Sequence, residues 1–206
     1  YLKMIQRYGR VVTQRNHLLR QMREGRVGPD ELKFWDDRLL NEGAAIIERR
    51  TRAVERLAQE AAPRHLALSG GRERLGVKYR PRISAVAEDG PDEIPDSTAD
   101  LISIMRVALV AARPREIGQG QTVIGPHRDE MALSLNDEPA GAFSSRGQAR
   151  TIALALRLAE GAFVTAATGR TPVLALDDVL SELDEKRRRL VLENVASYEQ
   201  VLITTT

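Results

Sequence analysis

The C-terminal part of the chain contains the pattern that most restricts the fold. Residues 171–176 form a short apolar run that ends on two adjacent carboxylates, Asp177 and Asp178. A helix is expected at residues 184–197, and residues 201–203 form a second short apolar run. A strand, a helix and a strand in this order favour a parallel pair joined by a crossover, with ligand chemistry at the carboxyl edge. The sequence therefore predicts an α/β fold.

The two carboxylates follow the first run directly, which is the arrangement of a Walker B site. One carboxylate can hold Mg²⁺, directly or through water, because this cation prefers oxygen ligands. The next carboxylate can orient and deprotonate an attacking water. An acidic strand end without a metal is the simpler interpretation, and for an isolated pair of this kind it would be favoured.

A serine turn precedes the run. Ser145, Arg146, Gly147 and Gln148 stand at the start of an expected helix. A helix N-terminus with free N–H groups and a hydroxyl suits an anion such as a γ-phosphate. Taken alone, serine in this position usually indicates helix capping. The order of serine turn, helix, acidic strand end and terminal strand makes a nucleotide site the stronger hypothesis.

The first part of the chain carries helical apolar spacing. Residues 2–24 form one stripe, interrupted by Arg15, and a second stripe follows from about residue 30 to 62. We expect an antiparallel helical hairpin that ends near Pro63. A protruding arm is favoured over a helix pair packed on the rest of the domain, because a helix of about 23 residues reaches roughly 35 Å. The predicted division is an arm at 1–68 and a second domain at 69–206.

The residue pattern in the middle of the chain predicts short strands, a loop and one helix. Alternating apolar residues predict strands near 75–79, 122–124 and 131–135. The acidic stretch 88–96, with two prolines, predicts a loop. Ser97 and Asp100 resemble a capping box, and the helix that follows is expected to end near Arg113 and Pro114.

Composition excludes several classes of protein. The chain has no cysteine, which excludes a disulfide scaffold, a thiol nucleophile and a Cys-ligated metal site. No apolar run reaches the roughly 18 residues of a membrane span, so no membrane partner is expected. Residues 1–85 carry 19 basic and 10 acidic side chains, whereas residues 86–206 carry 12 and 19. A basic first half suits polyphosphate or an acidic partner, or is a solvated helix face.

The segments SSRGQARTIALALRLAE, PVLALDDVLSELDEKRRRL and QVLITTT resemble the RecF family of SMC-like ATPases. The segment TVIGPHRDEM, residues 122–131, resembles another hallmark of that family. Related ABC-type ATPases share some of these motifs, but the combination is typical of RecF. The resemblance implies a partial ABC/SMC-type ATPase head, its C-terminal lobe, together with a helical-hairpin arm.

The resemblance also implies roles for single residues. Asp177 matches the Walker B ligand of Mg²⁺, and Asp178 matches the catalytic carboxylate that activates water. The signature motif, which contacts the γ-phosphate bound by the opposite subunit, is matched by Ser145, Gly147 and Gln148. The D-loop, which crosses the dimer interface, is matched by Ser181 and Asp184. The switch position of ABC-type ATPases falls near Thr205, where no histidine is present.

Two segments with basic side chains each allow a structural and a functional interpretation. The run from Pro126 to Asp129 is a family hallmark, but it also fits a rigid loop in which Arg128 pairs with Asp129 or a neighbouring acid. The arginines at 187–189 are expected on a solvated helix face, with phosphate or partner binding as the alternative.

The chain contains no P-loop of the form GxxxxGK[ST], which an ATPase of this type requires. The nearest sequence, residues 71–79, has Val77 in place of the lysine. We expect an arm and C-terminal lobe from a longer polypeptide, which also fits a start at Tyr1, and no tight ATP binding or hydrolysis by this chain alone.

For the complete protein, the resemblance implies an ATP-dependent homodimer that binds ATP and Mg²⁺ and acts in the cytoplasm. It would bind double-stranded DNA at single-strand gaps and help to load recombinase with RecO and RecR. The alternative is a non-catalytic module whose basic arm binds DNA or a partner protein.

Overall fold

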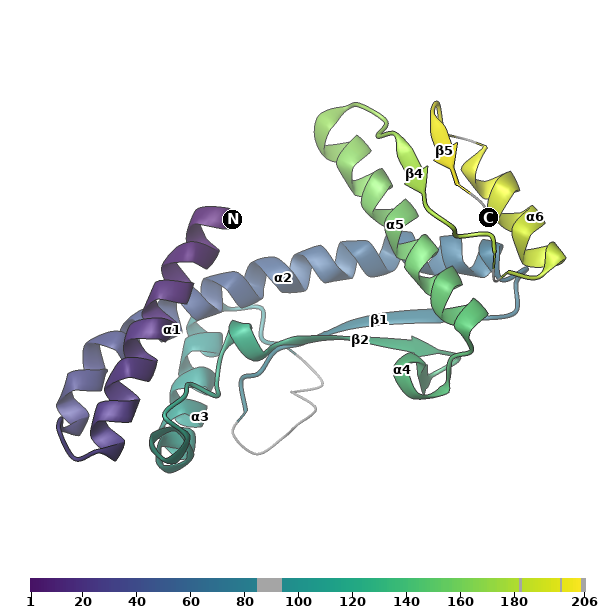
Figure 1. The fold of residues 1–206 in the computed structure, drawn as a ribbon. Helices are drawn as coiled ribbons and strands as arrows, with labels where there is room; N and C mark the ends of the chain where they lie inside the picture. The colour runs from purple at the N-terminus through teal and green to yellow at the C-terminus, as the bar shows by residue number, and fades with distance from the viewer. Residues whose placement is uncertain (85–93, 182, 197, 205–206) are drawn as a thin grey trace. The chain divides into compact units, whose positions relative to one another are not determined.

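The computed structural model describes residues 1–84, 94–181, 183–196 and 198–204 (Figure 1). The chain divides into two compact units. Unit 1 comprises Tyr1–Arg52 and Tyr79–Glu130, and unit 2 comprises Ala53–Lys78 and Met131–Thr206. These packing units do not coincide with the predicted division at residue 68, because one long helix contributes residues to both.

In the described part of the chain, unit 1 is built from three α-helices and two short 3₁₀ helices, the second of which is η2 (Pro126–Arg128). α1 (Leu2–Arg23) is followed by the short 3₁₀ helix η1 (Pro29–Leu32), by α2 (Lys33–Leu68), whose first part belongs to this unit, and by α3 (Thr98–Gln119). α1 and the start of α2 form the predicted helical hairpin, and α3 packs against α1 (Figure 1). The core of the unit is formed by aliphatic side chains from all three helices: Leu19, Leu39, Leu40, Ile46, Ile47, Leu101, Met105 and Leu109.

Both helices that were expected to stop at a proline continue past it. α2 runs through Pro63 to Leu68, and α3 runs through Pro114 to Gln119, where Gly120 adopts a left-handed φ of 64°. A proline inside a helix removes one hydrogen bond and costs about 3 kcal/mol. Other contacts hold the turns beyond each proline, since Leu68 is fully buried in the core of unit 2 and the carboxylate of Glu116 accepts two hydrogen bonds from Arg15. Packing therefore decides where these helices end.

Arg15, which interrupts the stripe of α1, lies in the core of unit 1 and is 0% exposed. Its guanidinium donates to both carboxylate oxygens of Glu116, at 3.1 and 2.5 Å, and to Asp36 Oδ1 at 2.9 Å. It also donates to the hydroxyl of Thr122 at 2.7 Å. A buried charge is tolerated when it is paired and hydrogen-bonded in this way.

The predicted strand at 122–124 is wrong, because this segment is irregular. The backbone N–H of Thr122 donates to Asn16 Oδ1 at 2.7 Å, and the N–H of Val123 donates to Glu116 Oε1 at 2.9 Å. Polar side chains therefore take the donors that a sheet partner would need. Residues 85–93, most of the predicted acidic loop, lie outside the described residues; 94–97 form neither helix nor strand.

The described residues form two small sheets, which lie in unit 2 except for Tyr79, Arg80 and Glu130 at the ends of two strands. The first has the order β1–β2–β3, from β1 (Leu75–Arg80), β2 (Glu130–Leu135) and β3 (Glu138–Pro139). β2 and β3 are antiparallel, and Asn136 and Asp137 turn between them with φ of 50° and 71°. The second sheet pairs β4 (Leu174–Leu176) and β5 (Val201–Ile203) in parallel, with Leu174 opposite Val201. The predicted parallel pair is confirmed, with β4 shorter than expected.

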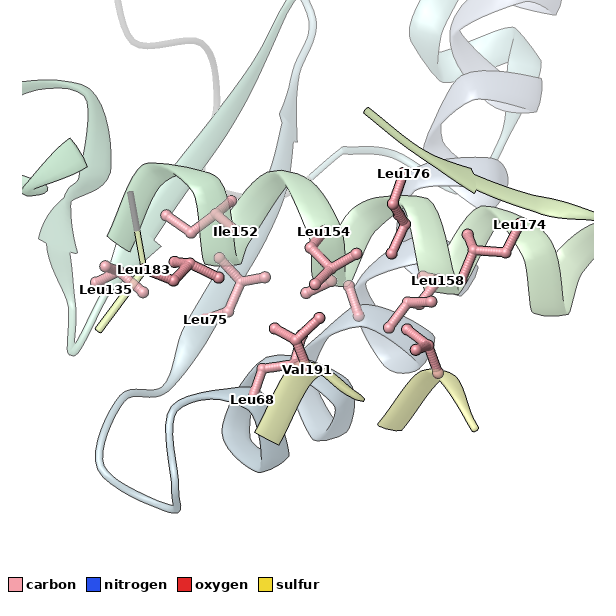
Figure 2. Packing of buried hydrophobic residues seen from close by; sticks show 14 of the residues in the cluster. Leu68, Leu75, Leu135, Ile152, Leu154, Leu158, Leu174, Leu176, Leu183 and Val191 are labelled. Atoms are coloured by element: carbon pink, nitrogen blue, oxygen red, sulfur yellow. The ribbon is translucent and has the colours of Figure 1, made fainter. Parts of the chain in front are cut away.

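Helices complete unit 2. They are α4 (Ala140–Phe143), α5 (Arg146–Thr168), the end of α2, and α6 (Glu185–Val195), which forms the crossover between β4 and β5. Figure 2 shows their shared core, in which α5 contributes Ile152, Leu154 and Leu158. These side chains meet leucines of β4 and Val191 of α6. The core fixes the positions of the N-termini of α5 and α6 and of the end of β4.

α5 is long and apolar enough to cross a membrane by length and composition. Within unit 2 it carries buried core side chains, and a core helix of a soluble protein passes the same test. The absence of a membrane partner therefore stays a prediction.

Candidate functional site

The end of β4 places the two predicted carboxylates. Asp177 is exposed and Asp178 is half-buried, with a φ of 48° that side chains rarely adopt. Thr204, directly after β5, donates its hydroxyl to Asp177 Oδ1 at 2.5 Å and accepts the N–H of Asp178 at 3.0 Å. The neighbouring strand thus fixes the acidic turn through one hydroxyl. Sequence reasoning placed the switch position near Thr205, which lies outside the described residues, and missed Thr204.

The signature turn, residues 145–148, is a complete capping box at the start of α5. Ser145 Oγ accepts the N–H of Gln148 at 3.2 Å, and Gln148 Oε1 accepts the N–H of Ser145 at 2.8 Å. The cap leaves Ser145 exposed at the positive end of a 23-residue helix. This geometry satisfies the capping interpretation and remains compatible with an anion that approaches from outside.

The predicted D-loop, of which Ser181, Leu183 and Asp184 are described, lies between the acidic turn and α6. Asp184 caps α6, because its Oδ1 accepts the N–H of Arg187 at 2.8 Å. Ser181 donates its hydroxyl to the carbonyl of Asp178 at 3.3 Å. The two predicted D-loop residues therefore lie at the beginning and the end of one short connection.

Arg150 connects the signature helix to this connection, and sequence reasoning missed it. Its Nη1 donates to the carbonyl oxygen of Asp178 at 2.8 Å and to Ser181 Oγ at 3.2 Å. The signature helix, the acidic turn and the D-loop are consequently linked by direct hydrogen bonds. The available signal was a cation less than two helical turns after Ser145.

The arginines of α6 do not share one environment. Arg187, expected on a solvated face, instead donates to Glu73 Oε1 at 2.7 Å and to Thr151 Oγ1 at 2.9 Å. The prediction is wrong for this residue, because its side chain points from α6 towards α5 and the loop that carries Glu73. Arg188 and Arg189 are exposed, as predicted, and Arg189 lies 3.6 Å from Glu193.

The hallmark run in unit 1 is a loop whose side chains bond to neighbouring segments of the same unit. His127 lies between the hydroxyl of Tyr8 and the carbonyl of Thr122, each at 3.0 Å, and desolvation lowers the pKa of its imidazole. The expected bond between Arg128 and Asp129 is replaced by others. Arg128 donates to Gln121 at 3.1 Å, and Asp129 pairs with Arg50 at 3.2 Å. The geometry supports the rigid-loop interpretation.

The acidic turn fits Mg²⁺ only as part of a larger site. Among the described residues, no three His, Cys, Asp or Glu side chains gather where they would hold a metal. Mg²⁺ usually keeps several waters and is held by one or two carboxylates together with phosphate oxygens. Exposed Asp177 meets that need, and the other ligands would come from nucleotide and water. Residues 71–79, rejected as a P-loop, lie largely in β1.

Comparisons with known proteins give consistent results. No protein-family model matches the sequence. The chain is 39% identical over its whole length to the DNA replication and repair protein RecF of Synechococcus sp. (strain JA-3-3Ab), of which it covers 53%. It is 40% identical over its whole length to RecF of Roseiflexus castenholzii, of which it covers 52%.

Solved structures agree with these relatives. The whole chain superposes with a TM-score of 0.83 and 28% identity on 53% of a structure described as the recombination mediator protein RecF with ATP in the RecFOR pathway. A second structure of that protein, described with ATPrS, matches with a TM-score of 0.81. The chain thus spans about half the length of the relatives and structures that it matches. The fold agrees with the predicted partial ATPase head and helical arm.

Proposed function

Since the whole chain is homologous to RecF proteins and fits the C-terminal part of that family, we propose that it supplies one half of an ATP-dependent DNA repair and recombination protein. One observation carries the proposal. Arg150 of the signature helix bonds to Asp178 and Ser181, which brings three motifs of a nucleotide site into one unit. Motif order alone could arise in unrelated folds, whereas this bonded arrangement supports the proposal that the three motifs serve one site.

The roles follow from the positions. Asp177 binds Mg²⁺, which with ATP would supply electrostatic stabilisation of the transferring phosphate. Asp178 orients and deprotonates the attacking water. Ser145, Gly147 and Gln148 contact the γ-phosphate held by the opposite subunit, with the positive end of α5 favouring the anion. Ser181 and Asp184 lie at the interface between the subunits.

The P-loop would come from the remaining half of the family's length. Exposed apolar side chains support this, because Val173 beside β4 and Leu202 of β5 face solvent in the two-stranded sheet. We therefore expect no tight ATP binding and no hydrolysis by the 206 residues alone. Calorimetry that detects micromolar binding of Mg-ATP to this chain would contradict that expectation.

The decisive experiment measures mass in solution. The chain is joined to the N-terminal half of a RecF relative, and its mass is determined with and without Mg-ATP. We expect an ATP-induced dimer, which Ser145→Arg abolishes because a bulky cation replaces the small hydroxyl at the shared site. Asp178→Asn should retain dimerisation and lose turnover. An equal mass with and without Mg-ATP would contradict the proposed shared site.

The partners of the joined protein are part of the same proposal. The dimer would act as a clamp on double-stranded DNA at single-strand gaps, in the cytoplasm, and help to load recombinase with RecO and RecR. The names of the relatives support a role in DNA replication and repair, and the RecFOR pathway named for the similar structure supports recombination partners. Binding of purified RecR to the joined protein, with and without gapped DNA, tests this part.

A second candidate function is a DNA-binding module, and the charge of α1 favours it. This 22-residue helix has one lysine and five arginines and contains no acidic residue. Arg15 is buried, but Lys3, Arg7, Arg10, Arg20 and Arg23 are exposed. Exposed cations of this kind attract the phosphate backbone of DNA without reading its sequence, and the spacing of Lys3, Arg7 and Arg10 places these three on one face of the helix.

Salt-titrated binding of duplex DNA to the 206-residue chain separates the two candidates. The module predicts affinity that falls steeply with salt, and removing two phosphate contacts should reduce the slope of log K against log salt by about 2. The variant is Arg7→Ala with Arg10→Ala, and Arg157→Ala on α5 is the matched control. Absence of binding by the chain alone would favour dependence on the ATP dimer.

A further inference from the structure

Glu73 lies in the loop between α2 and β1 and is 9% exposed. Its backbone is held by the end of α2. The N–H of Glu73 donates to Ser69 Oγ at 3.2 Å, and its carbonyl lies 3.3 Å from His65 Nδ1. The carboxylate of Glu73 therefore projects from a fixed main chain.

This carboxylate joins two elements that the sequence separates widely. Glu73 Oε1 accepts from Gln148 Nε2 of the signature turn at 3.2 Å and from Arg187 Nη2 of α6 at 2.7 Å. Gln148 belongs to the capping box around Ser145, and Arg187 donates its N–H to Asp184 of the D-loop. One oxygen atom thus bonds to both segments.

A second hydrogen bond connects α5 and α6 directly. Arg187 Nη1 donates to the hydroxyl of Thr151, one turn into α5. The side chains of Glu73 and Arg187 are each 12% exposed, so water screens their attraction weakly. Burial lowers the pKa of His65, whose Nε2 lies 3.9 Å from Glu73 Oε2. The imidazole therefore stays neutral near pH 7 and does not compete with Arg187 for the carboxylate.

We propose that Glu73 is a positioning residue that, through Arg187 and Gln148, fixes the separation between the signature turn and the D-loop. Glu73 itself touches no nucleotide in the proposed site. It holds the signature turn and the D-loop, which would both face the ATP bound by a partner subunit, in one fixed arrangement. This inference rests on the proposed function for its purpose, but its geometry can be measured without ATP.

The chain has no native cysteine, which allows a direct distance measurement. Spin labels are attached to the exposed positions Arg146→Cys, within the signature turn, and Glu185→Cys, at the start of α6. Pulsed electron resonance then gives the distribution of distances between them. We expect a narrow distribution with Glu73 present and about a twofold broader one in Glu73→Ala, because charge-assisted bonds hold the segments.

Two controls keep this measurement specific. Glu60→Ala removes an exposed partner of Arg64 on α2 of the same unit, and it should leave the distribution narrow. Glu73→Gln keeps the size and one acceptor oxygen but loses the charge, and it should give an intermediate width; it also serves if Glu73→Ala does not fold. Equal widths for the wild type and both Glu73 variants would overturn the inference.

The consequence for function is measured in the chain joined to a RecF N-terminal half. Glu73→Ala should weaken ATP-induced dimerisation by about tenfold, the effect of losing a hydrogen bond to a charged group. Glu73→Gln should recover part of that loss, which a purely packing role would not give. Unchanged dimerisation in both variants would overturn the inference. If ATP does not induce dimerisation of the wild-type joined protein, the proposed function is contradicted. The distance measurement still decides the role of Glu73 in that case.

Discussion

At the scale of single residues, His65 makes the stability of the protein depend on pH. Its side chain is fully buried in unit 2, and burial lowers its pKa below the ordinary value of 6.5. The unfolded chain therefore binds a proton at His65 at a pH where the folded chain does not. Stability should fall as the pH drops below 6.5, because acid favours the unfolded state.

The urea midpoint measured at about pH 7.5 and about pH 5.5 tests this effect. We expect the midpoint to drop on acidification in the wild type and to drop less in His65→Gln. Some dependence should remain, since the pKa of His127 is lowered as well. His17→Gln, at an exposed position of α1, is the control and should behave as the wild type. An identical drop in His65→Gln would exclude His65 as the cause.

The positions of the candidate site residues were predictable where those residues belong to a local motif, whereas their roles stay predictions. Asp177 and Asp178 were found because an apolar run ends on them, and Ser145 because a helix begins there. Glu73 and Arg187 were not, because they are 114 residues apart and their pairing depends on the tertiary structure. Thr204 was missed for the same reason, since its hydroxyl matters only after β5 pairs with β4.

At the scale of elements, two serine N-caps allow an effect on stability to be distinguished from an effect on function. Ser145 caps α5, and Ser97 caps α3 by accepting the N–H groups of Ala99 and Asp100. Replacing either with alanine should cost about 1 kcal/mol of unfolding free energy. In the joined protein, Ser145→Ala should also weaken ATP-induced dimerisation, whereas Ser97→Ala should not.

Denaturant unfolding of the chain and mass measurements on the joined protein give the two readouts. A matching loss of dimerisation in Ser97→Ala would mean that Ser145 acts through stability alone. Ser145→Asp retains a capping oxygen but adds a negative charge. It should therefore keep the stability of α5 and still oppose binding of a γ-phosphate.

Helices and strands were predictable to the extent that local chemistry decides them. The caps at Ser97 and Ser145 and the strands near 75–80 and 131–135 follow from the pattern of side chains. The helix ends did not follow, because tertiary contacts hold both helices beyond Pro63 and Pro114: Leu68 is buried in the core, and Glu116 is paired with Arg15. The segment 122–124 has the composition of a strand, but buried polar side chains bind its N–H groups.

At the scale of the whole molecule, each unit has its own core and its own polar centre. Unit 1 encloses Arg15 with Glu116 and Asp36, whereas unit 2 encloses Glu73 with Arg187. Each unit is assembled from two separate stretches of the chain. The division into an arm at 1–68 and a head at 69–206 stays a prediction, and the packing units differ from it because α2 contributes residues to both units.

Two separate cores predict that local stability can be changed in one unit without the other. Leu19→Ala in α1 and Leu158→Ala in α5 each remove a buried side chain and should cost about 2 to 5 kcal/mol. Native-state hydrogen exchange measures the result by segment. Leu19→Ala should accelerate exchange mainly in residues 1–52 and 79–130, and Leu158→Ala in 53–78 and 131–206. Acceleration throughout the chain in both variants would mean that the two cores unfold as one cooperative unit, because the continuous helix α2 then transmits the loss from either core to the other.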